Sequence, residues 1–197
     1  MSLTSDFYDS DPEGYFDRTF GADMSDARSR FVACLDPGAS ILDLGCGSCR
    51  DTVAFRDAGF DVTPADGSEG MRRVVRERLG IEVVPVDIAD MRLGRTFDGI
   101  WACASLLHVP SAELPGVMRS IRAMLRPGGA FFCCFKLGTF EGIRDGRFYT
   151  DLTEEGLRIL LGDAGFTVRE TWVSDGDGCR WVNAISAHDT VETTKTV

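Results

Sequence analysis

The sequence predicts a doubly wound α/β fold, and three observations support this prediction. Apolar runs of strand length alternate with segments of helical period along almost the whole chain. Most of these runs are apolar at successive positions, as in the buried strands of a parallel sheet. The first run leads through Asp43 into a turn with glycines at 45 and 47, which is typical of the strand, turn and helix start where such a sheet holds a nucleotide-like ligand.

The first half of the chain is expected to form three helices and three strands. In order, these are a helix capped by Ser25 and ended by residues 36–38, a strand over 41–44, a helix over 51–58, a strand over 60–66, a helix over 68–79 and a strand over 81–87. Pro64 lacks an N–H, so we expect an irregularity near Asp66, whereas Pro85 is compatible with an edge strand.

The second half continues the alternation. We expect a strand over 97–103, a helix capped by Ser111, a turn over 126–129, a strand over 130–135, a long connection over 136–151, a helix over 153–164 and strands over 166–173 and 181–187. No repeat or second domain is evident. The expected organisation is therefore one domain over 1–197, with an N-terminal helical lid segment (1–38), a core (39–189) and a loose tail (190–197).

The charge of the chain restricts its partners. A formal net charge of −10 and a pI near 4.7 repel nucleic-acid phosphates and anionic membrane surfaces. Residues 1–13 are polar and acidic, unlike a signal peptide, and no run reaches the ~18 apolar residues of a membrane span. We expect a cytoplasmic protein with a small-molecule substrate and neither a nucleic-acid nor a membrane partner, and the sequence does not predict an oligomeric state.

The seven cysteines are odd in number and lie mostly in apolar segments, which favours reduced, buried thiols over a disulfide framework. Cys46 and Cys49 form a C-x-x-C at a predicted helix start, so thiol redox chemistry remains an alternative for this loop. Cys133 and Cys134 are adjacent on a predicted strand and point to opposite faces, which disfavours a zinc site. No metal is expected.

The turn after the first strand has the chemistry of a ligand site. Gly45 and Gly47 permit positive φ and a close backbone approach, and the following helix start offers unpaired N–H groups. In the dinucleotide fingerprint a third glycine would stand at position 50, where this chain has Arg50. This difference argues against NAD or FAD as the ligand.

Carboxylates follow the first three predicted strands, at the sheet edge where α/β proteins bind ligands. Asp66 lies about twenty residues after the glycine turn, the spacing at which a carboxylate accepts both ribose hydroxyls. Asp87 can accept a hydrogen bond from an adenine amino group, with Ile88 as an apolar surface beside the ring. Each acid could instead cap a turn or helix.

Five segments carry a resemblance to a known family: ILDLGCGSCRD (41–51), Asp66, VDI (86–88), FDGIWACASLLH (97–108) and LRPGG (125–129). Over residues 15–187 the chain resembles the class I S-adenosylmethionine-dependent methyltransferases. Asp-Met-Ser at 23–25, with FKLG and DGRF after the fifth strand, resembles a group of small stand-alone bacterial-type members that has no settled substrate. Cys49 stands where this group usually has glycine.

The resemblance implies a Rossmann-like methyltransferase fold with strand order 3-2-1-4-5-7-6 and an antiparallel seventh strand. It implies S-adenosylmethionine as cofactor, with Gly45 and Gly47 at the methionine moiety, Asp66 at the ribose, and Asp87 and Ile88 at the adenine. The full set of expected cofactor-binding residues is Tyr15, Asp43, Gly45, Cys46, Gly47, Arg50, Asp66, Gly67, Ser68, Met71, Asp87, Ile88, Ala104, Ser105 and Leu106.

The acceptor side is less well determined by the sequence. His108 follows the segment expected beside the methyl group and is the candidate general base. The alternative, which the many methyltransferases that align an already ionised acceptor favour, is a histidine packed against Trp101 or a neighbouring helix. Tyr8, Tyr15 and Phe16 could close over the donor. The candidate substrate residues are Lys136, Arg144, Arg147 and Arg180, which would form an anion pocket if they converge and a solvated basic surface if they do not.

The expected function is transfer of a methyl group from S-adenosylmethionine to a small molecule with an O, N, S or other chalcogen nucleophile, anionic acceptors included. The alternative is a non-catalytic S-adenosylmethionine-binding regulatory or accessory module with a closed or absent acceptor cavity. A nicotinamide oxidoreductase is a third hypothesis, which Arg50 disfavours. Methylation of protein or nucleic acid is disfavoured because the chain has no added recognition domain and no overall basic character.

Overall fold

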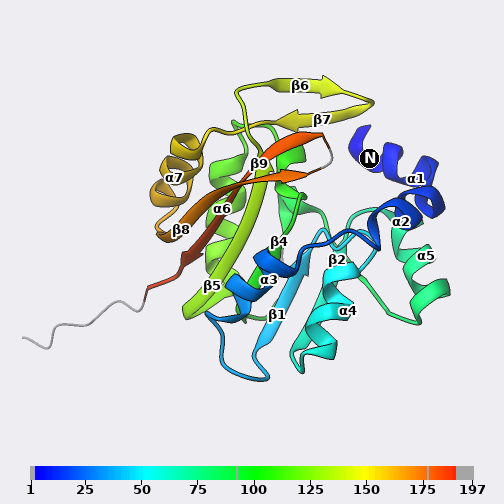
Figure 1. Ribbon diagram of the computed structural model, residues 1–197, viewed down its shortest axis with the longest axis horizontal. Helices are drawn as coiled ribbons and strands as arrows, with labels where there is room; N and C mark the ends of the chain where they lie inside the picture. Colours follow the sequence, from blue (N-terminus) through cyan, green and yellow to red (C-terminus); the bar gives the residue numbers. More distant parts are fainter. Residues whose placement is uncertain (1–2, 92, 177, 190–197) are drawn as a thin grey trace, which may run out of the picture.

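The computed structural model describes residues 3–91, 93–176 and 178–189. A central seven-stranded sheet is covered by helices on both faces (Figure 1). The strands of this sheet are β1 (Ser40–Leu44), β2 (Asp61–Asp66), β3 (Val84–Pro85), β4 (Phe97–Ala102), β5 (Leu125–Lys136), β8 (Thr167–Gly176) and β9 (Cys179–Ala187). The helices are α1 (Leu3–Ser10), α2 (Pro12–Thr19), α3 (Ser25–Val32), α4 (Arg50–Asp57), α5 (Glu69–Leu79), α6 (Leu114–Met124) and α7 (Glu154–Asp163), with short 3₁₀ turns η1 (Ile88–Asp90) and η2 (Leu106–His108).

The sheet has the order β3-β2-β1-β4-β5-β9-β8, and β9 is antiparallel to both neighbours. The predicted order 3-2-1-4-5-7-6 with an antiparallel seventh strand is therefore confirmed. Successive side chains of β1 point to opposite faces of the sheet, so the core has two parts. Ile41 packs with the residues of α3 and α4 on one face, and Leu42 and Leu44 pack with those of α6 and α7 on the other. The near-continuous burial of β1, β4 and β5 follows from helices on both faces.

The third predicted strand, 81–87, is reduced to Val84–Pro85. Its apolar residues Ile81 and Val83 are buried against α2 and α5 instead of pairing in the sheet. Pro64 causes no shift in the β1–β2 register, so the predicted irregularity is wrong. The missing N–H is tolerated because β3 pairs with β2 only from Ala65 onward, which leaves β2 without a ladder partner on that side at Pro64.

The connection predicted over 136–151 contains a hairpin of β6 (Glu141–Arg144) and β7 (Arg147–Thr150). Asp145 and Gly146 join the strands with φ values of 51° and 77°, as a two-residue turn of this kind requires. The Asp-Gly pair at 145–146, between strand-like residues, is the sequence signal that indicates this hairpin. The hairpin stands above the end of the sheet in Figure 1. Arg147 and Tyr149 of β7 line a cavity at this end.

Two predicted helix caps are wrong. Ser111 lies ahead of α6, which begins at Leu114, and both its N–H and its hydroxyl donate to the carboxylate of Glu141 on β6. Ser25 is the first residue of α3, and its N–H donates to Asp23. In each case a carboxylate offers the serine N–H a charged acceptor, which is stronger than a neutral one.

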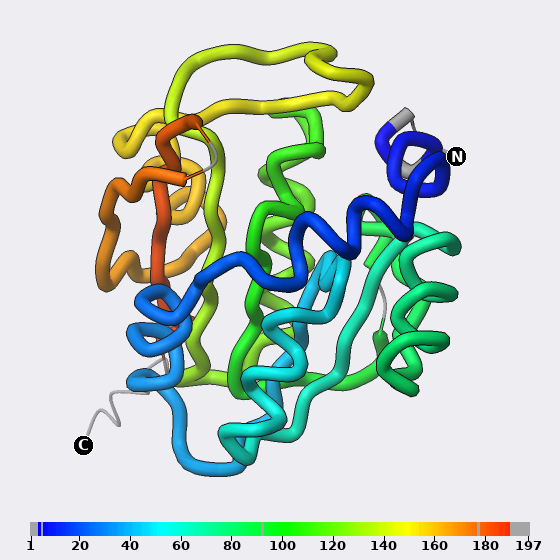
Figure 2. The backbone as a smooth tube through the Cα atoms, turned by 45° about the vertical axis from the view of Figure 1, so that its right-hand side comes forward, coloured from blue at the N-terminus to red at the C-terminus, as the bar shows by residue number. Residues whose placement is uncertain are grey.

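The N-terminal segment forms α1, α2 and α3 and crosses the molecule from α5 to the side of β5 (Figure 2). Its role as a lid stays a prediction, and the predicted tail over 190–197 lies outside the described residues. Within the described ranges, no helix has both the length and the apolar character needed to cross a bilayer.

Candidate active site

A cavity of about 1330 Å³ opens at the ends of β1, β2, β4 and β5, under α1 and α2. One part of its wall is formed by the loops after β1, β2 and β3, and the other by β5, the β6–β7 hairpin, β8 and β9. We call these parts the donor end and the acceptor end. All the expected cofactor-binding residues except Leu106 line it. Leu106 lies fully buried in the core, and Leu107 lines the cavity instead.

The loop after β1 depends on its glycines. Gly45 has a φ of 73° and Gly47 a φ of 50°, both in the left-handed region. A Cβ at Gly45 would lie 2.3 Å from the Cβ of Ser105, so only glycine allows the loops after β1 and β4 to meet. Ser105 strengthens the junction by donating its hydroxyl to the carbonyl of Leu44 at 2.8 Å.

Asp66, the last residue of β2, links the loops after β1 and β2 through hydrogen bonds. One carboxylate oxygen accepts from the N–H of Gly47 and the other from the N–H of Ser68, both at 2.8 Å. Burial raises the pKa of this carboxyl, and the two N–H bonds oppose the shift. Each oxygen keeps lone-pair capacity for one further donor, which is what two neighbouring ribose hydroxyls require.

Asp9 is a donor-end residue that the sequence analysis missed. Its carboxylate on α1 accepts from the Ser68 hydroxyl at 2.6 Å and from the N–H of Gly70 at 2.8 Å, in the first turn of α5. No local spacing indicates this contact, because Asp9 and Ser68 are 59 residues apart. Asp87 caps its own turn by accepting from the N–H of Ala89 at 2.9 Å, and it lines the cavity beside Ile88.

A buried polar cluster lies beneath the glycine loop. Asp51 accepts from Arg28 at 2.6 Å, from Arg50 at 2.7 Å and from the Trp101 indole at 3.0 Å. Arg50, the residue that replaces the third glycine of the dinucleotide fingerprint, is thereby fixed in the cavity wall. Burial raises the pKa of the neighbouring Asp43 to about 7, with Asp51 adding to the effect.

The Asp43 shift gives the fold a pH dependence of defined sign. With a folded pKa of about 7 and an ordinary value of 3.8, the carboxyl destabilises the fold when it ionises. Stability should therefore fall between about pH 4 and pH 7. Asp43→Asn should reduce this fall by about 2–3 kcal/mol between pH 5 and pH 8, as measured by urea unfolding at the two pH values. Asp61→Asn, at the exposed start of β2, is the control, and an equal change in both variants would contradict this assignment.

The cysteines are all free. The Sγ atoms of Cys46 and Cys49 are 3.4 Å apart, and burial raises the pKa of Cys46 well above its usual range. A thiolate is the reactive form, so this environment disfavours the redox alternative. Cys133 and Cys134 belong to opposite faces of the sheet, and the described part of the chain holds no group of ligands suited to a metal ion.

His108 is bonded at both ring nitrogens. Nδ1 lies 2.7 Å from the carbonyl oxygen of Phe148, and Nε2 lies 2.9 Å from the Tyr8 hydroxyl. Because a carbonyl only accepts, Nδ1 carries the proton and Nε2 accepts from Tyr8. Burial, together with the charges of Arg147 and Lys136, lowers the pKa of His108 to about 4. The imidazole is therefore neutral, and the lone pair on its unprotonated Nε2 already accepts the hydrogen bond from the Tyr8 hydroxyl.

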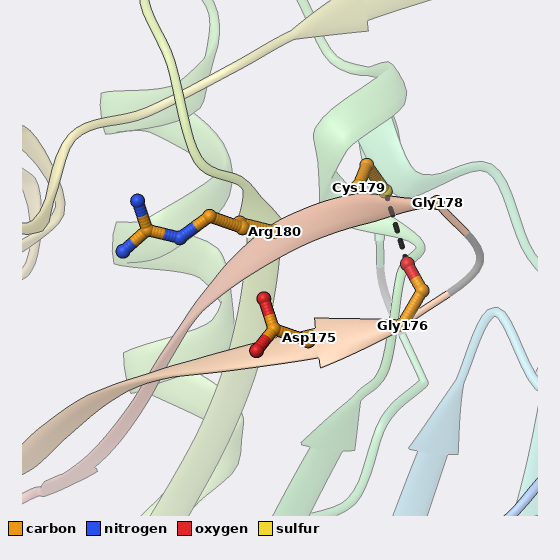
Figure 3. A pocket seen from close by; sticks show the side chains of 5 residues that line it. All are labelled: Asp175, Gly176, Gly178, Cys179 and Arg180. Atoms are coloured by element: carbon orange, nitrogen blue, oxygen red, sulfur yellow. Dashed lines mark hydrogen bonds between the residues drawn. The ribbon is translucent and has the colours of Figure 1, made fainter.

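The four cations expected to converge do not all do so. Lys136 and Arg147 line the cavity. Arg144 is paired with Asp151 at 3.0 and 3.2 Å and does not line it. Arg180 does not line the cavity and lies beside an adjoining surface hollow at the turn between β8 and β9 (Figure 3). Alternation along β9 explains this position, because Trp181 takes the cavity side.

Residues 41–129 match a family model described as a methyltransferase domain. The chain is 38% identical over 101 residues to methyltransferase GfsG of Streptomyces halstedii and 32% identical over 143 residues to sterol 24-C-methyltransferase ERG6B of Gibberella zeae. These matches cover 47% and 66% of this chain, and 36% and 35% of the two relatives. The chain thus spans about a third of the length of these curated relatives.

Solved structures extend the likeness to nearly the whole chain. One is Burkholderia thailandensis 1,6-didemethyltoxoflavin-N1-methyltransferase with bound 1,6-didemethyltoxoflavin and S-adenosylhomocysteine, at a TM-score of 0.78 and 26% identity, covering 94% of this chain and 87% of that one. Another is the glycopeptide N-methyltransferase MtfA with S-adenosylmethionine, at 0.69 and 20%, covering 85% and 95%. The second shows the fold alone. In its strand order, its glycine loop and the segment matched by the family model, the chain is similar to the class I S-adenosylmethionine-dependent methyltransferases.

Proposed function

We propose that the protein transfers the methyl group of S-adenosylmethionine to a small-molecule acceptor with an O, N, S or other chalcogen nucleophile, anionic acceptors included. The observation that carries the proposal is the continuity of the cavity, which runs from Asp66 at the donor end to Lys136 and Asn183 at the acceptor end. The solved relative with bound 1,6-didemethyltoxoflavin and S-adenosylhomocysteine supports a small-molecule acceptor.

In this proposal the Asp66 carboxylate accepts hydrogen bonds from the two ribose hydroxyls. Asp87 and Ile88 border the adenine, and the backbone at Gly45 and Gly47 contacts the methionine part. Ala104 and Ser105, in the loop after β4, border the methyl group between the two ends of the cavity. The sulfonium already activates the methyl group, so the chain contributes mainly alignment of the acceptor with the departing sulfur. Alignment of this kind lowers a barrier by roughly 7–11 kcal/mol.

A non-catalytic binding module is the competing function. It would keep the donor end but close the acceptor end, whereas here the cavity continues past Ala104 to Trp172 and Asn183. The open acceptor end therefore favours an enzyme.

Binding and turnover test the proposal separately. We expect calorimetry to give micromolar dissociation constants for S-adenosylmethionine and S-adenosylhomocysteine, and labelled methyl donor to mark at least one member of a metabolite panel. Gly45→Ala, which disturbs the donor loop, is the negative control. Absence of binding at millimolar concentrations would contradict donor recognition, and binding without turnover across the panel would favour the non-catalytic module.

A further inference from the structure

The floor of the acceptor end is formed by two cross-strand rows. Cys134, Asn183 and Trp172 are register partners on β5, β9 and β8, and so are Lys136, Trp181 and Ser174. Register partners point to the same face of a sheet, and all six line the cavity. The floor thus combines two indole rings with the Asn183 amide and the Ser174 hydroxyl, and it has an ammonium group at its edge.

Lys136 and Arg147 lie together at this edge. The Lys136 Nζ is 4.5 Å from the centroid of the Tyr149 ring, and the Arg147 Cζ is 5.2 Å from the same centroid. Neither has a carboxylate partner within the described ranges, although the chain has 31 acidic residues. Arg147 donates from Nη1 to the Tyr8 hydroxyl at 3.4 Å, and its buried Nε, like that of Arg144, has no hydrogen-bond partner. The ion pair of Arg144 with Asp151 on the same hairpin shows the usual arrangement. Two half-buried cations in the cavity wall, neither with a carboxylate partner, favour an anionic ligand.

His108 is not placed to remove a proton from an acceptor. Its Nδ1–H donates to the Phe148 carbonyl, and its Nε2 accepts from Tyr8. The charges acting on it are those of Arg147 and Lys136, which oppose an imidazolium. The same positive field favours a negative charge on a neighbouring ligand.

Other titratable or charged groups also border this chamber. They are Tyr8 on α1, Asp23 and Asp26 at α3, Cys103 after β4, Glu113 before α6, Cys134 on β5, Tyr149 on β7, Asp175 on β8 and Cys179 on β9. None of these carboxylates contributes to the pKa shift of His108. Arg144, which is paired with Asp151, also lies over the Tyr149 ring, with its Cζ 4.6 Å from the ring centroid.

We propose that the methyl acceptor binds as an anion of a flat, weakly acidic molecule, such as a phenolate or a deprotonated heterocycle, with its charge beside Lys136 and Arg147. The inference rests on the proposed function and names its substrate class. The acceptor proton leaves to solvent on binding. The acceptor anion then forms a bond to the methyl carbon as the carbon–sulfur bond breaks, and that electron pair stays on sulfur as the neutral thioether. His108 positions Tyr8 and transfers no proton.

The ionisation of 4-nitrophenol, which is visible in its absorption spectrum, tests the proposal without turnover. Protein saturated with S-adenosylhomocysteine is titrated with this probe across a pH series. We expect the bound probe to ionise 1–2 pH units lower than the free probe, which corresponds to about 10–100-fold tighter binding of phenolate than of phenol. The double variant Lys136→Met/Arg147→Met should lose this preference, and Arg180→Met, outside the cavity, should keep it.

The outcomes separate this inference from the proposed function. Failure of S-adenosylhomocysteine to bind in calorimetry would overturn the proposed function and the inference with it. If that nucleoside binds but the probe binds as neutral phenol, or does not bind, only the anion proposal is overturned. A phenolate preference that survives the double variant but disappears in His108→Asn would assign proton removal to the histidine and also overturn it.

Discussion

Gly45→Ala is expected to abolish donor binding and to destabilise the fold by about 3 kcal/mol. The residue has a φ of 73°, which costs an L-residue roughly 1–2 kcal/mol. The new Cβ would also lie 2.3 Å from the Cβ of Ser105. Relief of that overlap separates the loops after β1 and β4, which in our proposal border the methionine part of the donor. Thermal unfolding and calorimetry with S-adenosylhomocysteine measure the two effects.

Two variants separate backbone strain from steric overlap at Gly45. Gly38 has a φ of 76°, and a Cβ there meets nothing within 4 Å, so Gly38→Ala carries the strain alone. Ser105→Gly removes the atom that the alanine would strike, so the pair Gly45→Ala/Ser105→Gly should recover donor binding in part. If Gly38→Ala were as damaging as Gly45→Ala, or if the pair recovered nothing, the overlap would not be the cause.

Asp66→Ala is expected to weaken S-adenosylhomocysteine binding by roughly 100-fold or more. Two hydrogen bonds from ribose hydroxyls to a carboxylate are lost, at about 1.5–3 kcal/mol each. The N–H groups of Gly47 and Ser68 also lose their acceptor, which loosens the donor loop. Calorimetric titration of the nucleoside measures the loss.

Asp61→Ala is the matched control, because this aspartate lies at the exposed opposite end of the same strand. It should leave nucleoside affinity unchanged. Asp66→Asn, which keeps one acceptor oxygen, should be intermediate. A change of less than about threefold in Asp66→Ala would exclude the ribose role.

The sequence predicted the sheet well because its strands are continuous apolar runs with glycine or capping signals between them. The prediction of a strand over 81–87 failed because apolar residues can be buried outside a sheet. Ile81 and Val83 are buried against α2 and α5. It also failed at Ser111, whose acceptor Glu141 lies 30 residues away. The hairpin at Asp145-Gly146 carried a recognisable turn signal, and its strands are short and partly exposed.

In the candidate site, too, the sequence predicted what local motifs determine and missed what depends on contacts between distant residues. The donor end was accessible from the sequence because Gly45, Gly47 and Asp66 belong to local motifs with fixed spacing. The acceptor end is assembled from separated segments, so sequence alone did not show that Arg144 has a carboxylate partner while Arg147 has none. The bond between Tyr8 and His108, which are 100 residues apart, has no local signal either.

The short helix α1 has a kinetic consequence. Its neighbouring residues Asp9 and Tyr8 are fastened to opposite ends of one cavity, the first at the start of α5 and the second at the imidazole. We propose that α1 moves as one unit and opens both ends of the cavity together, so a fluorophore on this helix should report a single rate when either the demethylated nucleoside or the methylated product departs.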